Sequence, residues 1–481
     1  MAGLRKLDDY RWEIPVDYKP GMRVPGLVYL SEEMLEAARQ DEALEQVANV
    51  AFLPGIVGRS LAMPDIHWGY GFPIGGVAAT RVSDGVISPG GVGYDINCGV
   101  RLLRSDLLES EVAPRMVAII DRLFRNVPSG VGSEGRLRPP KGEIPRLLVE
   151  GARWAVRRGF GTAEDLEATE DGGCVQGADP SAVSERALTR GLPQAGSLGS
   201  GNHFIEIQAV REIYDEDAAA VMGIDSIGQV LVLIHTGSRG LGHQVCTDHL
   251  KAMERAVIKY GITLPDRQLA CAPIESPEGR QYLAAMRCAA NYAWCNRQHI
   301  AHWVRESFME VFGLPPDRLG LRQVYDVAHN IAKVETHKVD GRDIQVCVHR
   351  KGATRAFPPG HPALAERFRP IGQPVLIPGD MGRYSYIAVG TELAMKDTFG
   401  STCHGAGRLL SRAAARKAAR GADVAESLRS RSITVRTDDV PALAEEAPGA
   451  YKDVASVVDV VVGAGICRKV ARAEPLGVIK G

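Results

Sequence analysis

The sequence predicts a mixed α/β fold in which helices and short strands alternate along 481 residues. Apolar residues at helical spacing occur in segments such as 117–124 and 279–312, whereas the short apolar run 230–234 is typical of a buried strand. Loops rich in Gly and Pro separate these segments. The length alone allows two to four domains or one large domain with insertions.

The composition indicates a globular protein, with 45% hydrophobic and 24% charged residues. No run of about 20 apolar residues occurs, so no membrane span is expected. The first ten residues are charged and lack the apolar core of a secretory signal. The nine cysteines are scattered without a C-x-x-C pair, which favours reduced thiols and a cytoplasmic location.

A net charge of −1 neither supports nor excludes a nucleic-acid partner, because binding depends on local patches. Basic residues crowd two regions, 136–158 and 408–420. For either region alone, a solvated surface is the favoured interpretation.

The N-terminal part predicts a helix and then a polar loop. Ser31 is a suitable N-cap for a helix that extends through Leu44 or beyond. Many Gly and Pro residues then exclude a long regular element over 62–77. Asp65 and His67 lie two apart in this segment, so they are candidates for an active-site loop; a surface turn with a capping Asp is the alternative.

The glycine-rich stretch 88–101 holds one carboxylate, Asp95, and one thiol, Cys98. A bend can aim both side chains at one point, and this pair of donors suits Mn, Fe, Co or Zn. The alternative is a tight turn with a buried Cys and a capping Asp.

Three histidines lie where loops meet strands. His203 follows a second glycine-rich loop and precedes a strand over 204–208, a position where histidine is more often structural. His235 ends the strand 230–234, and function is favoured there. His329 precedes Asn330 in the segment 324–332. The pairs His243/His249 and His299/His302 are expected to be structural.

The C-terminal third contains two segments that are candidates for binding or reacting with a phosphate group. Basic residues at Arg350, Lys351 and Arg355 suggest a turn that faces a phosphate. The segment 398–408 is expected to lead directly into an Arg/Ala-rich helix that extends to about 420, with His404 at its start as a candidate nucleophile toward phosphorus. A strand over 433–436, a helix over 454–462 and a basic end complete the prediction.

Together, these donors suit a two-metal site that clamps phosphoryl oxygens, with a thiolate shared between the metals. The five candidate ligands are Asp95, Cys98, His203, His235 and His329. The motifs that contain them resemble those of the RtcB family of RNA-splicing ligases over nearly the whole chain. The matching stretches are 63–76, 88–101, 201–206, 235–240, 328–330 and 404–408.

The resemblance implies an RNA ligase that joins a 2′,3′-cyclic phosphate or 3′-phosphate end to a 5′-hydroxyl end, in tRNA splicing or in RNA repair. It implies a single α/β domain over 1–481, with packed sheets around a metal cleft, and the use of GTP and two Mn²⁺ ions. Cys98 would bridge the metals, Asp95 and His203 would complete one site, and His235 and His329 the other. An archease-type activator is a further partner that the resemblance leaves open.

By the same resemblance, His404 would attack the α-phosphorus of GTP and carry GMP. Asp65 resembles an active-site acid of the family, and its action on the cyclic phosphate is our hypothesis. The residues expected to contact the guanylate are Asn202, His203, Phe204, Glu206, His329, Asn330, Pro378, Gly379, Met381, Ser385, His404, Gly405, Ala406, Gly407 and Lys480.

Two other classes of function fit the same residues. A non-catalytic RNA-binding or chaperone-like protein would bind RNA without forming a GTP-dependent adduct. A metal-dependent phosphatase or nuclease would use the metal cleft without a guanylate. The intact His404 and the five ligands argue against the first class.

Overall fold

Two large sheets form the framework of the chain, for which a computed structural model describes residues 3–481. The first has seven strands in the order β1 (Arg5–Lys6), β2 (Arg11–Ile14), β3 (Gly26–Tyr29), β4 (Ile56–His67), β5 (Ile74–Arg81), β13 (Arg342–Lys351) and β12 (Asn330–Val339). The second has the order β11 (Arg322–Ala328), β7 (Gly99–Leu108), β9 (Gln229–Thr236), β8 (Phe204–Ile213), β19 (Cys467–Lys480), β16 (Ser385–Gly390) and β15 (Pro374–Ile377), with β18 (Thr434–Arg436) beside β19. This arrangement confirms the mixed α/β fold.

Two short pairs of strands and sixteen α-helices complete the described part of the chain. The short pairs are β6 (Val86–Ile87) with β10 (Ala272–Pro273) and β14 (Ala353–Arg355) with β17 (Ser401–Cys403). The helices are α1 (Glu32–Gln40), α2 (Ala43–Val50), α3 (Glu109–Val112), α4 (Met116–Asn126), α5 (Ile144–Glu150), α6 (Ala152–Arg157), α7 (Ala163–Glu167), α8 (Glu185–Gly191), α9 (Glu216–Met222), α10 (Arg239–Lys259), α11 (Pro277–Phe312), α12 (Pro316–Leu319), α13 (Glu392–Asp397), α14 (Arg412–Ala418), α15 (Gly421–Ser430) and α16 (Val454–Gly463).

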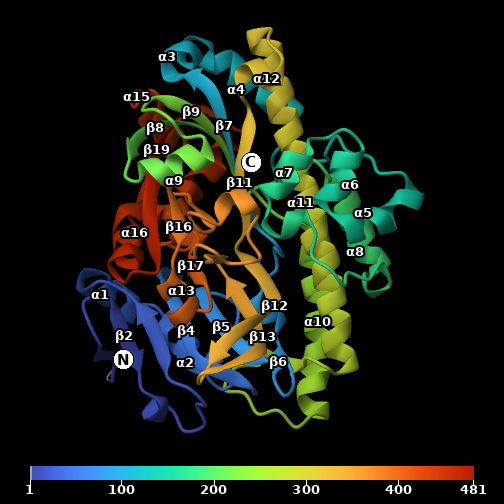
Figure 1. Cartoon of the computed structure of the whole chain (residues 1–481), viewed down its shortest axis with the longest axis vertical. Helices are drawn as coiled ribbons and strands as arrows, with labels where there is room; N and C mark the ends of the chain where they lie inside the picture. Colours follow the sequence, from blue (N-terminus) through green and yellow to red (C-terminus); the bar gives the residue numbers. More distant parts are fainter. Residues whose placement is uncertain (1–2) are drawn as a thin grey trace.

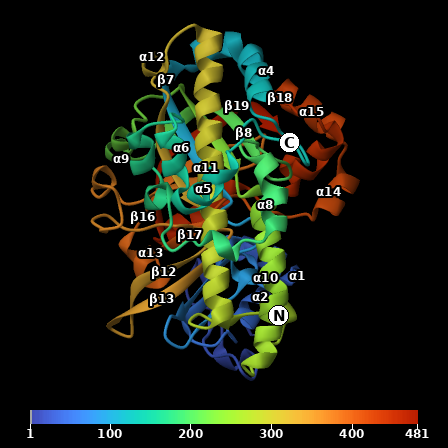
Figure 2. The same ribbon diagram turned by 90° about the vertical axis from the view of Figure 1, so that its right-hand side faces the viewer.

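The long helices α10 and α11 lie along one side of the molecule; α11 runs past both sheets, whereas α10 lies beside the lower half (Figures 1 and 2). Alternating apolar residues of the second sheet, such as Ile205 and Ile207 of β8, are buried with Ile119 of α4 and Ile300 of α11. The opposite face is buried against α9 and α15. This two-sided burial accounts for the continuous apolar run of β9.

The two sheets meet at His329. Strand β11 belongs to the second sheet and β12 to the first, and His329 is the single residue between them. Its backbone N–H donates to Cys98 O at 2.9 Å, and its carbonyl accepts from Ala353 N at 3.1 Å. Segments from both sheets therefore converge at this residue.

The helix expected over 31–44 is two helices. Ser31 is the N-cap, because its Oγ accepts from Met34 N at 3.3 Å. The helix ends at Gln40, where Asp41 adopts an extended conformation and its carboxylate accepts from Ala43 N, at the first residue of α2. The capping carboxylate of Asp41 thus breaks a pattern that apolar spacing alone would continue.

The segment with Asp65 and His67 is a strand, so the expectation of a loop over 62–77 was wrong for 62–67, which belong to β4, and for 74–77, which belong to β5. Strand β4 continues to His67, but its pairing with β5 is irregular between Ala62 and His67. Pro64 lies in this irregular part, where a missing N–H costs no ladder hydrogen bond.

The phosphate-facing turn expected at Arg350, Lys351 and Arg355 was also wrong. All three side chains are buried: Arg350 pairs with Glu335, and Arg355 pairs with Glu170 and Asp171. The Nζ of Lys351 donates to Tyr70 O and Phe72 O at 2.6 and 3.0 Å. These cations therefore hold strands β13 and β14 in place.

His404 does not lie at the start of a helix. It follows β17, and α14 begins only at Arg412, with Ser411 as its N-cap. The C-terminal segment after α16 is the fourteen-residue strand β19, for which the sequence predicted only a basic end.

Other expectations are confirmed. Strand β18, helix α11 and helix α16 lie close to their predicted ranges. His299 is buried, and its Nδ1 lies 2.8 Å from Cys295 O, as a structural histidine would. All nine cysteines are free and buried. Among residues 3–481, no helix combines the length and apolar character needed to cross a membrane.

Candidate active site

Five side chains form two overlapping groups of metal-type ligands. One group is Cys98, His235 and His329, and the other is Asp95, Cys98 and His203. Within each group the ligand atoms lie within 4.8 Å of one another. Cys98 Sγ lies 3.5 Å from His203 Nε2 and 3.3 Å from His235 Nε2, so the thiol is shared. The structure thus brings together all five ligands expected from the sequence.

The strand register explains why residues so distant in sequence meet. His235 of β9 is paired with Val100 of β7 on one side and with Phe204 of β8 on the other. Cys98 precedes β7 and His203 precedes β8, so all three ligands lie at the same end of neighbouring strands.

The loop before Cys98 is a tight turn whose geometry depends on two left-handed residues. Gly93 and Asn97 have φ values of 94° and 52°, and Cys98 N donates to Asp95 O at 2.9 Å. The buried guanidinium of Arg297, from α11, donates to Asn97 O and Thr236 O at 2.7 and 2.9 Å. Helix α11 therefore anchors both the loop and the end of β9.

Burial controls the protonation of this cluster. Burial, reinforced by the charge of Asp95, raises the pKa of the Cys98 thiol well above its ordinary value. Burial and the neighbouring histidines lower the pKa of His235 and His329 well below 6.5. For Asp95, burial alone would raise the pKa, but His203 and Arg239 together hold it below its ordinary value.

The donors fit a divalent metal of intermediate softness. A thiol and three imidazoles are buried together beside the partly buried carboxylate of Asp95. The Sγ atom and the histidine Nε2 atoms lie close to one another. His235 Nε2 and His329 Nε2, for example, lie 3.3 Å apart. Mixed S, N and O ligands of this kind bind Mn, Fe, Co or Zn, so the residues present match the metal site that the motifs implied.

His404 is held by Asp65. The Oδ2 atom of Asp65 lies 2.5 Å from His404 Nδ1 and accepts from His404 N at 3.0 Å. A carboxylate oxygen that accepts places the ring proton on Nδ1 and leaves the Nε2 lone pair free. The ring centroid of His404 lies 4.8 Å from that of His329, so this free nitrogen is next to the ligand cluster.

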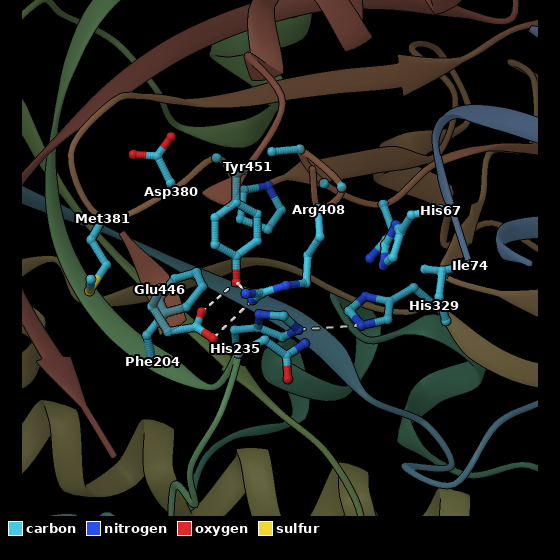
Figure 3. A pocket seen from close by; sticks show the side chains of 18 of the residues that line it. His67, Ile74, Phe204, His235, His329, Asp380, Met381, Arg408, Glu446 and Tyr451 are labelled. Atoms are coloured by element: carbon cyan, nitrogen blue, oxygen red, sulfur yellow. Dashed lines mark hydrogen bonds and ion pairs between the residues drawn. The ribbon is translucent and has the colours of Figure 1, made fainter. Parts of the chain in front are cut away.

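A cavity of about 230 Å³, here called the central cavity, opens beside these rings (Figure 3). The sequence-predicted residues that line it are Asn202, Phe204, His235, His329, Asn330, Pro378, Gly379, Met381, His404, Gly405, Ala406, Gly407 and Lys480. Those that lie outside its lining are Asp65, Asp95, Cys98, His203, Glu206 and Ser385.

Glu206 and Ser385 are nonetheless connected to this lining. Gln208 Nε2 donates to both Glu206 Oε2 and Ser385 Oγ, at 2.7 and 3.0 Å, and Gly379 N donates to Ser385 Oγ at 3.4 Å. Burial raises the pKa of Glu206 to about 8, so its carboxyl group is mostly protonated at neutral pH.

Eight lining residues were not among the predicted metal ligands, nucleophile or guanylate contacts, although His67 was a candidate for an active-site loop: His67, Ile74, Gly352, Asp380, Arg408, Arg412, Glu446 and Tyr451. Arg408 Nη1 donates to Tyr451 OH at 2.8 Å and to Glu446 at 3.2 Å, and Lys480 Nζ donates to Glu446 at 3.1 Å. His67 and Arg408 lie inside the quoted motifs, so a signal existed for them. Glu446 and Tyr451 lie in an ordinary polar stretch that offers none.

Comparison with known proteins identifies the family of the chain. Residues 46–481 match the family model described as tRNA-splicing ligase RtcB. A protein named tRNA-splicing ligase RtcB from Archaeoglobus fulgidus is 60% identical over 478 residues, 99% of each chain. Proteins with the same name from Thermococcus kodakarensis and Methanococcus maripaludis are 56% and 55% identical, over 100% and 99% of this chain and 99% of theirs. The chain belongs to the RtcB family.

Proposed function

We propose that the chain is an RNA ligase that consumes GTP and joins a 2′,3′-cyclic phosphate or 3′-phosphate end to a 5′-hydroxyl end. The family and the names of its relatives support RNA ligation in tRNA splicing. One observation carries the chemistry: His404, with Nδ1 held by Asp65, lies between a cavity and a buried cluster of metal-type ligands.

His404 acts first, as a nucleophile. Its Nε2 lone pair attacks the α-phosphorus of GTP, a P–N bond forms, and pyrophosphate leaves with the electron pair of the broken P–O bond. Nδ1 carries the ring proton and donates a hydrogen bond to Asp65. Nε2 therefore attacks without first losing a proton.

GMP is then transferred from His404 to the RNA 3′-phosphate. A cyclic end is first opened by water to a 3′-phosphate, whose oxygen attacks the phosphorus of the adduct and returns the lone pair to Nε2. The 5′-hydroxyl oxygen attacks the phosphorus of the RNA end, its proton passes to solvent, and GMP leaves with the electron pair of the broken P–O bond. The activation is needed because a 3′-phosphate monoester has no good leaving group.

The ligand cluster would hold two divalent metals, for which we propose Mn²⁺. Cys98 would contact both, with Asp95 and His203 for one metal and His235 and His329 for the other. Bound metal supplies positive charge that stabilises the phosphoryl oxygens during transfer.

Asp65 is better suited to positioning His404 than to acting on the cyclic phosphate. Its side chain is fully buried and does not line the central cavity, and Oδ2 is occupied by His404. We therefore propose that Asp65 orients the nucleophile, in place of the acid role expected from the motif.

The guanine end of the nucleotide is proposed to lie near Phe204 and Met381, at the end of the cavity away from His67 and His329 (Figure 3). Lys480 Nζ lies 5.5 Å from the centre of the Phe204 ring. An aromatic face beside a cation and the carboxyl group of Glu206 suits a purine with donor groups on its edge.

Labelling with α-³²P GTP and Mn²⁺ tests the proposal. The chain should form a covalent GMP adduct that maps to His404, and His404→Ala should abolish it, whereas His361→Ala, a histidine outside the central cavity, should retain it. RNA binding without an adduct would instead indicate a non-catalytic binding protein, and RNA cleavage or dephosphorylation without an adduct would indicate a nuclease or phosphatase.

The cellular setting is proposed by the same reasoning. We propose cytoplasmic tRNA halves as substrates, broken RNA in repair as a second source of the same ends, and a single catalytic domain over 1–481. Ligation of tRNA halves and of a cleaved stem-loop, each with and without an archease-type activator, distinguishes the substrates and shows whether an activator is needed.

A further inference from the structure

A second cavity, of about 560 Å³, lies beside the central cavity, and we call it the Trp68 cavity. Arg408 lines both cavities, and His67 of the central cavity is directly followed by Trp68 of the second. The residues that line it are Ala37, Ala38, Gln40, Asp41, Glu42, Ile66, Trp68, Arg408, Leu409 and Lys452. The two cavities are therefore neighbours across a shared wall.

Trp68 is 54% exposed, whereas Trp12, Trp154 and Trp294 are buried. Its backbone is fixed, because Trp68 N donates to Asp41 Oδ2 at 3.2 Å. Leu409, which lines the same cavity, is 53% exposed. An exposed indole on a backbone that is held in place can serve as a platform on which a flat ring stacks.

The position of this platform points to RNA. In the central cavity, His67, Ile74 and His329 lie at one end, and Met381 and Phe204 lie at the other (Figure 3). If guanine occupies the Phe204 end, as proposed above, the RNA ends approach from the His67 end. Trp68 follows His67 directly, so a nucleotide whose phosphate reaches His404 has its base near this cavity.

The charges in the cavity favour a base over a phosphate. Asp41 and Glu42 line it and would repel an anion. Its cations are already engaged: Lys452 Nζ donates to Pro64 O and Ile66 O at 2.9 and 2.5 Å, and Arg408 bonds to Glu446 and Tyr451. An uncharged ring with amino groups on its edge satisfies both the indole face and the carboxylates.

We propose that the Trp68 cavity holds the terminal nucleobase of the RNA strand that carries the 3′-phosphate, stacked on Trp68. The inference rests on the proposed function, because the proposed ligase mechanism requires the 3′-phosphate of this strand to reach the GMP on His404. It assigns to this strand a base-binding site distinct from the guanylate site.

The test uses the full chain loaded with Mn²⁺ and a labelled ten-nucleotide RNA that ends in a 3′-phosphate. Trp68→Ala should weaken binding of this RNA roughly tenfold, as expected for the loss of one base–aromatic stack, and Trp68→Phe should restore most of it. Ile227→Ala, which removes a side chain 56% exposed outside both cavities, is the matched control and should bind RNA as the parent chain does.

An RNA that lacks only its terminal base shows whether Trp68 and that base contact each other, because the two changes can be compared singly and together. The parent chain should bind this abasic RNA about tenfold more weakly than the intact RNA, while Trp68→Ala should bind both equally. Equal binding of intact RNA by Trp68→Ala and the parent chain would overturn the proposal. An abasic penalty that persists in Trp68→Ala would overturn it as well.

Failure of the proposed function gives a different result. Adduct formation with α-³²P GTP reports on the nucleotide site without any RNA. A chain that forms no adduct refutes the ligase mechanism, whereas a chain that forms the adduct and ligates RNA but shows no Trp68 effect refutes only the base site.

Discussion

Asp65 determines which nitrogen of His404 faces the central cavity. Its carboxylate accepts from both the backbone N–H and Nδ1 of His404, and its own side chain is fully buried on β4. A neutral imidazole has one donor and one acceptor nitrogen, so a fixed acceptor at Nδ1 leaves the lone pair on Nε2.

Replacing Asp65 with Asn tests this role. The Asn amide can donate to Nδ1, which moves the ring proton onto the attacking nitrogen, so adduct formation should slow by about 100-fold or more. The rate of label transfer from α-³²P GTP measures the effect, and Asp84→Asn, a surface change, serves as control. An unchanged rate in Asp65→Asn would show that the carboxylate does not select the nitrogen.

The guanidinium of Arg239 lies against His203, one of the proposed metal ligands. Its Nη1 lies 3.2 Å from His203 Nδ1, while His203 Nε2 lies 2.8 Å from Asp95 Oδ2. An arginine only donates, so Nδ1 accepts here and the ring proton is on Nε2, the atom that should face a metal. Metal-bound histidines instead donate their other N–H to an acceptor. To bind a metal through Nε2, His203 would need its ring proton on Nδ1, an arrangement that the neighbouring Arg239 guanidinium disfavours.

Removal of the charge at Arg239 should favour metal binding. Arg239→Met should raise the Mn²⁺ affinity of the Asp95–Cys98–His203 group by about tenfold or more, since a nearby cation no longer opposes the ion. Electron paramagnetic resonance of free Mn²⁺ during a titration measures the affinity. Arg190→Met, an exposed arginine bonded to Gln244, should leave it unchanged, and the same affinity in both variants would contradict this effect of Arg239.

At the scale of elements, helix α11 connects the metal loop to the second sheet. Arg297 of α11 and Arg101 of β7 both bond to Asp326 of β11, at 2.9 and 2.7 Å, and all three side chains are fully buried. Arg297 also donates to Asn97 and Thr236, next to Cys98 and His235. One buried ion-pair cluster thus joins a helix, two strands and the ligand loop.

Breaking this cluster should affect stability and metal binding together. Arg297→Met leaves Asp326 with one cation and the loop carbonyls without donors, so the free energy of unfolding should fall by about 3–5 kcal/mol. Mn²⁺ affinity should fall as well. Arg280→Met, at an exposed pair on the same helix, should cost less than about 1 kcal/mol. Denaturant unfolding measures the free energy of unfolding of the two variants. Equal losses in Arg297→Met and Arg280→Met would refute the anchoring role of Arg297.

The elements that the sequence predicted well are those defined by local pattern. Helix α11 and strand β9 follow directly from apolar spacing, and the ligands of the site follow from motifs that adjoin strands. What could not be predicted depends on distant partners. Arg350 and Arg355 looked like phosphate ligands because their buried partners, Glu335 and Glu170, lie elsewhere in the sequence.

The same limitation applies to β4 and to the residues near His404. Gly and Pro in 62–77 suggested a loop, but the residues on either side of Pro64 pair with β3 and β5, and the ladder is irregular where Pro64 lies. In the central cavity, Glu446 bonds to Arg408 and Lys480, and Tyr451 bonds to Arg408, partners that are distant in sequence. No local signal marks such residues.

At the scale of the whole molecule, the ligand cluster lies where the two sheets meet. Asp95 and Cys98 precede β7, His203 precedes β8, His235 belongs to β9, and His329 links the two sheets. A metal that contacts all of these segments binds the folded chain and not the unfolded one. Its binding free energy therefore adds to the stability of the fold.

Mn²⁺ at 100 times its dissociation constant should stabilise the chain by about 2.7 kcal/mol, and a chelator should reverse this. The effect should grow with pH: the raised pKa of Cys98 keeps the thiol protonated at neutral pH, so binding must release that proton. His235 and His329, with pKa values well below 6.5, are already neutral and release none.

The apparent Mn²⁺ affinity should therefore rise about tenfold per pH unit between pH 6 and 8, with one proton released from the shared thiol. Thermal unfolding at several Mn²⁺ concentrations and pH values measures it. Cys98→Ala should lose both the stabilisation and its pH dependence, because it removes the one ligand that the two groups share. A stabilisation that is independent of pH, or that persists in Cys98→Ala, would mean that Mn²⁺ binds elsewhere on the chain.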